Sequence, residues 1–215
     1  MRVLLLGATG KVGAPILHEL LDRGHQVTAV VRDPTRLPAA GASLHHRAGD
    51  VFDAAFLAES ARGAEVVVCA VALRDAAQHD RTPVALMRGV GQAALAAGAR
   101  LVAMGGAGSL RTSTGVDLVD TPGFPEVAKP ESLGFRAALH DLAGSAPADL
   151  VWTVVSPPPA IEVDGPRTGA YRTADDELLI DAAGVSRISA ADLAVAVVDE
   201  VENPKHPRRR FAVAY

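Results

Sequence analysis

The feature that most constrains this chain is a glycine-rich turn that directly follows an apolar run. Residues 1–6 read MRVLLL, which is typical of a central parallel strand buried on both faces. The turn GATGKVG occupies 7–13, and apolar side chains follow it at helical spacing: Ile16, Leu17, Leu20 and Leu21. A strand, a glycine turn and an amphipathic helix in this order predict the first βα unit of a doubly wound sheet.

The three glycines of this turn have separate physical roles. Gly7 permits the tight exit from the strand, Gly10 lets backbone N–H groups approach a pyrophosphate, and Gly13 lets the helix pack closely on the sheet. The spacing G-x-x-G-x-x-G differs from the commoner G-x-G-x-x-G, but a helix N-terminus attracts anions in either case. A tight turn without a ligand is the alternative interpretation. The flanking strand and helix favour a dinucleotide site.

Strand and helix patterns alternate along the first half of the chain. We expect helices over 12–23, 53–60, 79–97, 131–143 and 190–202, and strands over 26–31, 44–47, 65–70, 100–104, 150–155 and 211–213. The predicted fold class is α/β: a Rossmann-type, doubly wound, mostly parallel sheet with a small C-terminal substrate lobe. We expect one domain over 1–215, with the lobe built from parts of 105–130 and 156–189.

Composition narrows the class of partner. With 49% hydrophobic and 21% charged residues the chain is expected to be globular, and a net charge of -4 argues against nucleic acid. The one cysteine, Cys69, lies in an apolar run and is interpreted as a buried structural thiol. No metal-ligand spacing, leader or membrane-length apolar run is evident. We therefore expect a cytoplasmic monomer or homodimer that acts on a small molecule.

The end of the second predicted strand bears on the choice of cofactor. NAD binders place a carboxylate about 20 residues past the turn, where it holds the ribose hydroxyls. Here Arg32 stands 19 residues after Gly13, and a guanidinium attracts a 2′-phosphate. Arg36 is expected to assist Arg32 in binding the 2′-phosphate. In the alternative interpretation, the Asp33 carboxylate contacts the ribose instead. NADP(H) is therefore expected in preference to NAD(H).

Further cofactor contacts follow from position at the ends of the later strands. Asp50 is interpreted either as an acceptor for the adenine amino group, with Val51 packed on the ring, or as a turn-forming residue. Small residues after the other strands leave room for a dinucleotide. The full set of cofactor-binding candidates is Gly7, Thr9, Gly10, Lys11, Val12, Gly13, Arg32, Arg36, Asp50, Val51, Ala70, Val71, Gly105, Gly106, Ser156 and Pro157.

The chain resembles the atypical short-chain dehydrogenases/reductases that carry a single NAD(P)H-binding domain. The likeness is to the NADH-flavin reductase-like group, which is related to the NmrA-like and biliverdin reductase B/flavin reductase proteins. It covers essentially the whole chain and implies a pyridine-nucleotide oxidoreductase. The sequences that carry it are GATGKVG at 7–13, VRDP at 31–34, GDVFD at 49–53, MGGAGSL at 104–110, VDTPGFP at 119–125, SPPP at 156–159, RTGAYR at 167–172, SRIS at 186–189 and NPKHPRRRFAVAY at 203–215.

The proton donor of ordinary ketone reductases is missing from the sequence. Such enzymes use a Tyr-x-x-x-Lys pair, but Tyr171 is followed four residues later by Asp175, and Tyr215 is the last residue. Flavin reduction requires less, because hydride passes directly to the ring and solvent supplies the proton. Ser109 and His79 are the candidate catalytic residues, with a loop cap and a helix-terminal histidine as the alternative interpretations.

The sequence is therefore compatible with three functions. The first is an NADPH-dependent oxidoreductase that reduces a flavin or a similar planar acceptor. The second is a non-catalytic, NmrA-like redox sensor that binds the dinucleotide and a protein partner. The third is an epimerase or dehydratase with a displaced acid, which would act on a sugar nucleotide and depend on Ser109 or His79. Turnover of NADPH with different acceptors discriminates among them.

Overall fold

The structure, a computed structural model, describes residues 1–73 and 80–215. In that part of the chain one sheet contains β1 (Arg2–Leu6), β2 (Gln26–Val31), β3 (Leu44–Ala48), β4 (Val66–Cys69), β5 (Arg100–Met104), β6 (Trp152–Ser156), β10 (Arg209–Ala214) and β8 (Arg172–Ala174). The helices are α1 (Gly13–Asp22), α2 (Ala54–Ala61), α3 (Pro83–Ala96), α4 (Lys129–Ser145) and α5 (Ala190–Glu202). Short 3-10 turns cover Pro34–Arg36, Ala107–Ser109, Leu118–Asp120 and Glu126–Ala128.

The order of the strands places the binding crevice. Their order across the sheet is β3-β2-β1-β4-β5-β6-β10-β8, and every pairing is parallel except that of β10 with β8. The chain moves outward from β1 in one direction through β2 and β3, and then returns to the other side of β1 at β4. This is a topological switch point, and ligands of such sheets bind at the carboxyl ends of the strands beside it. The predicted Rossmann-type fold is confirmed.

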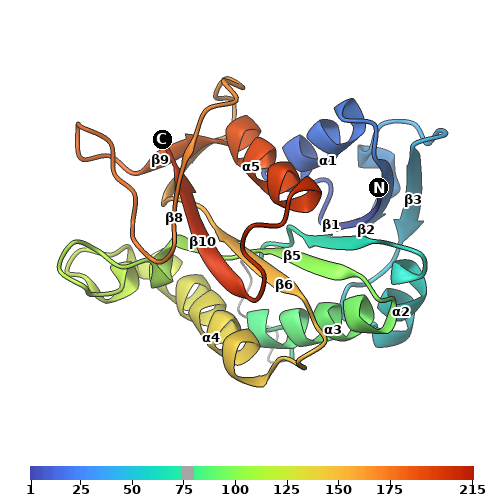
Figure 1. Ribbon diagram of the computed structural model, residues 1–215, viewed down its shortest axis with the longest axis horizontal. Coiled ribbons are helices and arrows are strands. Elements are labelled where there is room, and N and C mark those ends of the chain that lie inside the picture. Colours follow the sequence, from blue (N-terminus) through green and yellow to red (C-terminus); the bar gives the residue numbers. More distant parts are fainter. Residues whose placement is uncertain (74–79) are drawn as a thin grey trace.

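Helices cover both faces of the sheet and explain why the central strands are apolar throughout. Helices α1 and α5 lie on one face, and α2, α3 and α4 lie on the other (Figure 1). Along β1, residues 3–6 alternate between the two cores: Val3 and Leu5 pack under α1 and α5, whereas Leu4 and Leu6 pack under α2 and α3. A strand buried on both faces shows no polar alternation, as the sequence MRVLLL indicated.

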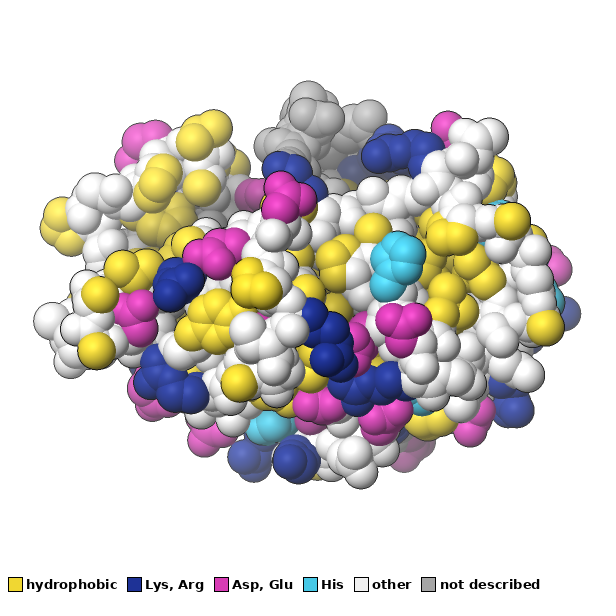
Figure 2. Space-filling view, turned by 90° about the horizontal axis from the view of Figure 1, so that it is seen from above, with side chains coloured by type: hydrophobic (Ala, Val, Ile, Leu, Met, Phe, Trp, Pro, Cys, Tyr) yellow, Lys and Arg dark blue, Asp and Glu magenta, His cyan; other side chains and the backbone are white. Residues whose placement is uncertain are grey.

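Charged side chains surround the α1 and α5 face. Figure 2 shows positive and negative side chains interspersed with apolar ones there. Arg23 donates to Asp199 at 2.7 Å and to Glu202 at 2.8 Å, which joins α1 to α5. Buried Glu19 accepts two hydrogen bonds of 2.8 Å from Arg167. These bonds connect the loop before β8 to α1. None of the described helices has the length and apolarity that a membrane crossing requires.

One buried carboxylate on α5 holds the segment that follows β6 and the side chain of Tyr215. Asp192 is 0% exposed; it accepts from the amides of Thr168 and Gly169 at 2.8 and 2.7 Å and from the Tyr215 hydroxyl at 2.6 Å. Beside it, β7 (Ala160–Glu162) pairs in parallel with β9 (Arg187–Ser189). The segment between β6 and α5 is therefore ordered by side-chain contacts more than by long strands.

Several predicted boundaries shift for identifiable reasons. The helix expected over 79–97 begins at Pro83, because the Thr82 hydroxyl accepts from the Ala85 amide and caps it there. The last strand extends over 209–214 instead of 211–213, since Arg209 and Arg210 pair with β6. The strand expected over 150–155 occupies 152–156, and the helix expected over 131–143 occupies 129–145.

Candidate functional site

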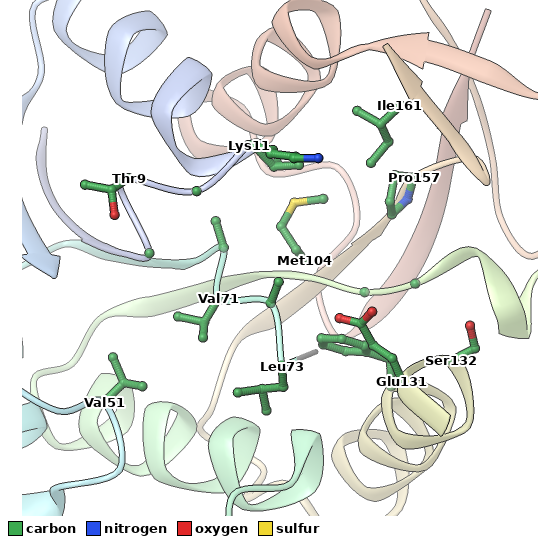
Figure 3. A pocket seen from close by; sticks show the side chains of 18 of the residues that line it. Thr9, Lys11, Val51, Val71, Leu73, Met104, Glu131, Ser132, Pro157 and Ile161 are labelled. Atoms are coloured by element: carbon green, nitrogen blue, oxygen red, sulfur yellow. The ribbon is translucent and has the colours of Figure 1, made fainter. Parts of the chain in front are cut away.

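A cavity of about 670 Å³ opens at the carboxyl ends of β1, β2, β4, β5 and β6. It runs across the switch point from the loop after β2 to α4 and the prolines after β6 (Figure 3). That volume lies within the range of ligand pockets, about 300–1,000 Å³. Fourteen of the sixteen cofactor candidates line it: Gly7, Thr9, Gly10, Lys11, Val12, Arg32, Arg36, Asp50, Val51, Ala70, Val71, Gly105, Gly106 and Pro157.

The glycine turn has no space for a side chain at its first and last positions, Gly7 and Gly13. Gly7 has a φ of 84°, and a Cβ there would lie 2.8 Å from the Ala70 carbonyl oxygen. A Cβ on Gly13 would lie 2.0 Å from the Gly7 carbonyl oxygen, so Gly13 packs under the turn and does not line the cavity. Both are positions where only glycine fits without rearrangement. The roles expected of Gly7 and Gly13 in chain geometry agree with these contacts.

The N-terminus of α1 faces the cavity without a cap from the protein itself. Val12 occupies the cap position with no side-chain hydrogen bond, and the first turn holds no acidic residue. Within the described residues, the amides of Lys11 and Val12 have no hydrogen-bond acceptor. Free amides at a helix N-terminus form an anion site. This part of the cavity therefore fits a pyrophosphate, which would supply the missing acceptors.

The β2 side of the cavity is lined by guanidinium groups. Arg32 and Arg36 both line it, and both are exposed. Asp33 forms local hydrogen bonds instead. Its Oδ1 accepts from the amide and the hydroxyl of Thr35 at 3.0 and 2.7 Å, which caps the start of the short turn Pro34–Arg36. Asp33 is not among the residues that line the cavity. Within the described residues, Asp33 forms no ion pair with Arg32, so its hydrogen bonds to Thr35 account for its carboxylate.

Asp50 forms an ion pair that the sequence pattern missed. Its carboxylate accepts from both terminal nitrogens of Arg81, the Nη1–Oδ1 distance being 3.1 Å, and its Oδ1 accepts from the Phe52 amide at 3.0 Å. The Arg81 bonds hold the pKa of Asp50 below its usual value, and the charge of nearby Arg32 adds to the effect. Arg81 also lies 4.9 Å above the Phe52 ring. Three arginines and one paired aspartate give this end a positive balance.

The opposite end of the cavity is mostly apolar. It is lined by Leu73, Met104, Phe124, Pro125, Phe135, Pro157, Pro158, Pro159 and Ile161, with Glu131 and Ser132 on α4. Most of these residues were not individually expected, although Phe124 and Pro125 belong to the VDTPGFP segment and Pro158 and Pro159 to SPPP. Glu131 gave no signal in the sequence, because a lone glutamate at the start of a helix is ordinary.

Ser109 lies outside the cavity, contrary to its predicted catalytic role. It is 7% exposed, and its hydroxyl and carbonyl oxygens accept from Arg210 Nη1 at 2.9 and 2.8 Å. Arg210 also forms an ion pair with Asp176. The prediction failed because proximity to the end of β5 in sequence does not reveal which way the turn Ala107–Ser109 faces. Ser109 anchors the loop that carries Gly105 and Gly106 to β10.

Ser156 also lies outside the cavity, contrary to its expected cofactor contact. It is 1% exposed, and its hydroxyl has no hydrogen-bond partner within the described residues. The hydroxyl lies behind Gly105, where a Cβ would be 3.0 Å from its Oγ. Because β6 ends at Ser156, the side chain still follows the alternation of the strand and points into the protein, whereas Pro157 lines the cavity.

The remaining candidate acids and nucleophiles do not line the cavity within the described residues. His79 lies outside the described residues. Tyr171 and Tyr215 donate to Asp199 and Asp192, and neither lines the cavity. Cys69 is buried, and burial raises the pKa of its thiol to about 11, which agrees with a structural role. No group of His, Cys, Asp and Glu within 1–73 and 80–215 could hold a metal ion.

Comparison with known proteins agrees with this geometry. The family described as NAD(P)H-binding matches residues 7–203 of this chain. The protein YwnB of Bacillus subtilis (strain 168), whose description is "uncharacterized", is 34% identical over 99% of this chain and 98% of its own length. The match therefore extends beyond the glycine turn to the lobe and the C-terminal strand.

Two solved structures are similar over the full chain but have different descriptions. A protein of Streptococcus pneumoniae, proposed to be an NADH-flavin reductase, is 31% identical with a TM-score of 0.85, covering 100% of this chain and 99% of its own. A protein of Bacteroides thetaiotaomicron, proposed to be an epimerase, is 32% identical with a TM-score of 0.90, covering 100% and 96%. Similarity thus defines the binding fold, and the reaction has to be inferred from the site.

Proposed function

This chain belongs to the family described as NAD(P)H-binding, and from that premise we propose that it is an oxidoreductase of the atypical short-chain dehydrogenase/reductase type that transfers hydride from NADPH to a flavin or a similar planar acceptor. The family match shows an NAD(P)H-binding domain over residues 7–203. The choice of NADPH and of a planar acceptor is our proposal.

The positive end of the cavity supports NADPH over NADH. Arg32 and Arg36 line the cavity beside the end of β2, where the adenosine ribose of a dinucleotide lies when its pyrophosphate is at the α1 N-terminus. Guanidinium groups bind phosphate through charge-assisted bonds. Asp33, the carboxylate that would favour ribose hydroxyls, caps the turn Pro34–Arg36 instead.

The apolar end supports a planar acceptor. When bound, NADPH supplies the hydride, and the overall reaction consumes one proton, which solvent delivers to the reduced acceptor. The protein's part is to orient the two rings and to exclude water. Phe124, Phe135 and Met104 offer flat or deformable apolar surfaces, and the prolines after β6 make the opposite wall stiff.

One observation carries the proposal: the positive end and the apolar end belong to a single continuous cavity in which no tyrosine side chain is present. Ketone reduction with a tyrosine acid is therefore disfavoured, because both tyrosines bond to aspartates elsewhere. Hydride transfer to a flavin needs no such acid.

The test is NADPH oxidation by the purified protein with riboflavin and with a neutral quinone as acceptors. We expect turnover with at least one of them and a lower KM for NADPH than for NADH. Tight NADPH binding without oxidation across both acceptors would support the sensor function instead. Activity on a sugar nucleotide, with none on planar acceptors, would support an epimerase.

A further inference from the structure

Glu131 lies at the acceptor end of the cavity. Among the described residues, the carboxylates that line the cavity are Asp50 and Glu131, and Asp50 is paired with Arg81 at the other end. Glu131 lies in the first turn of α4, a helix of 17 residues, where the helix dipole favours a negative charge. Within the described residues its carboxylate has no hydrogen-bond or ion-pair partner. It is therefore available to a ligand.

The direction of the side chain makes Glu131 part of the cavity wall. In Figure 3 its carboxylate points from α4 into the cavity, toward the chain that leaves β5, while Ser132 lies beside it on the same helix. The Lys11 side chain enters the cavity from the turn before α1, on the other side from Glu131 in this view. An acceptor in this space thus meets apolar surfaces, a carboxylate on the α4 wall and an ammonium on the α1 wall.

A carboxylate can only accept hydrogen bonds, so it selects for donors. In a mostly apolar cavity an anionic ligand group beside Glu131 would be repelled, and the cost of like charges grows as water is excluded. A neutral group with an N–H would instead gain a charge-assisted bond. The chemistry of this wall therefore matches a ring with a polar N–H, such as a cyclic imide.

Resting on the proposed function, we propose that Glu131 determines acceptor specificity: its carboxylate accepts a hydrogen bond from the imide N–H of a planar acceptor and disfavours anionic acceptors. An isoalloxazine ring carries such an imide. Glu131 is in this account a specificity residue that touches the acceptor, and it transfers no proton.

The direct test is a comparison of two flavins that differ only at the imide. Dissociation constants for lumiflavin and for lumiflavin methylated on the imide nitrogen are measured by fluorescence quenching, with the protein saturated by NADP⁺ so that no hydride transfer occurs. Wild-type protein should bind lumiflavin about tenfold more tightly than the methylated form. Glu131→Ala should reduce this preference to less than about twofold.

A matched control comes from the chain just before α4. Glu126 is exposed, pairs with Lys129 at 2.9 Å and lies outside the cavity, so Glu126→Ala should leave the flavin preference unchanged. Thermal unfolding and NADP⁺ affinity of each variant show whether the fold and the cofactor end are intact. A similar loss of preference in both variants would contradict a specific role of Glu131.

A second variant separates the hydrogen bond from the charge. Glu131→Gln keeps a carbonyl acceptor but removes the negative charge, so it should retain part of the imide preference. It should also raise the affinity for naphthoquinone sulfonate, relative to uncharged naphthoquinone, about fivefold or more. If the ratio of the two naphthoquinone affinities is unchanged, the negative charge of Glu131 does not contribute to acceptor specificity.

The outcomes for the two proposals are distinguishable. If flavins bind with the expected imide preference but NADPH is not oxidised, the proposed function fails and the specificity of Glu131 stands. If NADPH is oxidised but Glu131→Ala lowers the affinity for both flavins equally, the proposed function stands and the specificity role of Glu131 fails. If wild-type protein binds neither flavin, the assignment of an imide acceptor to Glu131 is wrong.

Discussion

The two ends of the cavity are built in different ways. At the α1 end, Gly7, Gly10 and Gly13 lie within seven consecutive residues, and the backbone amides of Lys11 and Val12 lie at the cavity. At the acceptor end, the wall combines residues from four separate parts of the chain: Leu73, 104–106, 124–135 and 157–161. The first end is determined by local backbone geometry, whereas the second is determined by how loops pack against one another. Substitutions at the α1 end should therefore disturb the backbone that binds the nucleotide, whereas substitutions at the acceptor end should change how the loops pack.

The largest effect is expected at the base of the glycine turn. Gly13→Ala places a Cβ 2.0 Å from the Gly7 carbonyl oxygen, so the turn must shift. We expect NADPH affinity to fall by roughly a hundredfold or more, with overpacking costing about 1–3 kcal/mol of stability. Calorimetric titration and thermal unfolding measure both. Gly144→Ala on α4, where an added Cβ meets no atom within 4 Å outside its own part of the helix, is the control: it should leave NADPH affinity unchanged and should not lower stability, because Ala favours a helix over Gly.

The next effect concerns the guanidinium beside β2. Arg32→Ala should weaken NADPH by about thirtyfold, roughly 2 kcal/mol, while NADH changes by less than about threefold. Competitive titration of the two nucleotides gives the ratio. Arg62→Ala is a suitable control, because Arg62 is exposed and lies outside the cavity. Equal losses of NADPH and NADH would show that Arg32 contributes only general positive charge.

Ser109 tests whether the acceptor end depends on packing more than on a catalytic hydroxyl. Ser109→Ala removes one acceptor from buried Arg210, so the free energy of unfolding should fall by about 1.5–3 kcal/mol. Because Ser109 lies outside the cavity, kcat should change by less than about threefold, whereas loss of a general acid costs about a hundredfold or more. A hundredfold loss of kcat in a folded variant would restore its catalytic role.

The smallest expected effect is the pH dependence of the Asp50–Arg81 pair. The pKa of Asp50 is lowered in the folded state, so the pair stabilises the fold above the unfolded pKa, about 3.9, and this contribution is lost as pH falls through the folded pKa. Both side chains are about two-fifths exposed, so Asp50→Asn should cost at most about 1 kcal/mol near neutral pH. Unfolding curves at several pH values should show wild type and variant converging below about pH 4.

The sequence predicted the α1 end well because its determinants are local. An apolar strand, glycines at 7, 10 and 13 and a helix-spaced apolar pattern define the backbone without reference to distant residues. The lining position of Arg32 follows from the same unit, since β2 runs parallel to β1 and ends beside it. Boundaries were wrong mainly where a cap such as Thr82 sets the start of a helix.

The acceptor end was predicted only as a set of segments. The loop over 105–130 and the prolines after β6 were expected near the site, but Glu131 and Phe135 were not named, because their exposure to the cavity depends on the packing of α4 against α3 and the turn Ala107–Ser109. Arg81 was missed for a similar reason: its pairing with Asp50 spans 31 positions of sequence. Ser109 and Ser156 were assigned by nearness in sequence, which says nothing of side-chain direction at the end of a strand.

The reversal of strand order at β1 and β4 has a consequence for how such a protein can diversify. It leaves an opening whose floor belongs to the buried sheet and whose far wall belongs to surface loops. Substitutions in those loops can change which substrate binds beside the nicotinamide, while the buried core that stabilises the fold stays the same. The same scaffold can thereby acquire new chemistry in a few steps, and full-length similarity between two such proteins is a better guide to their shared nucleotide than to their separate substrates.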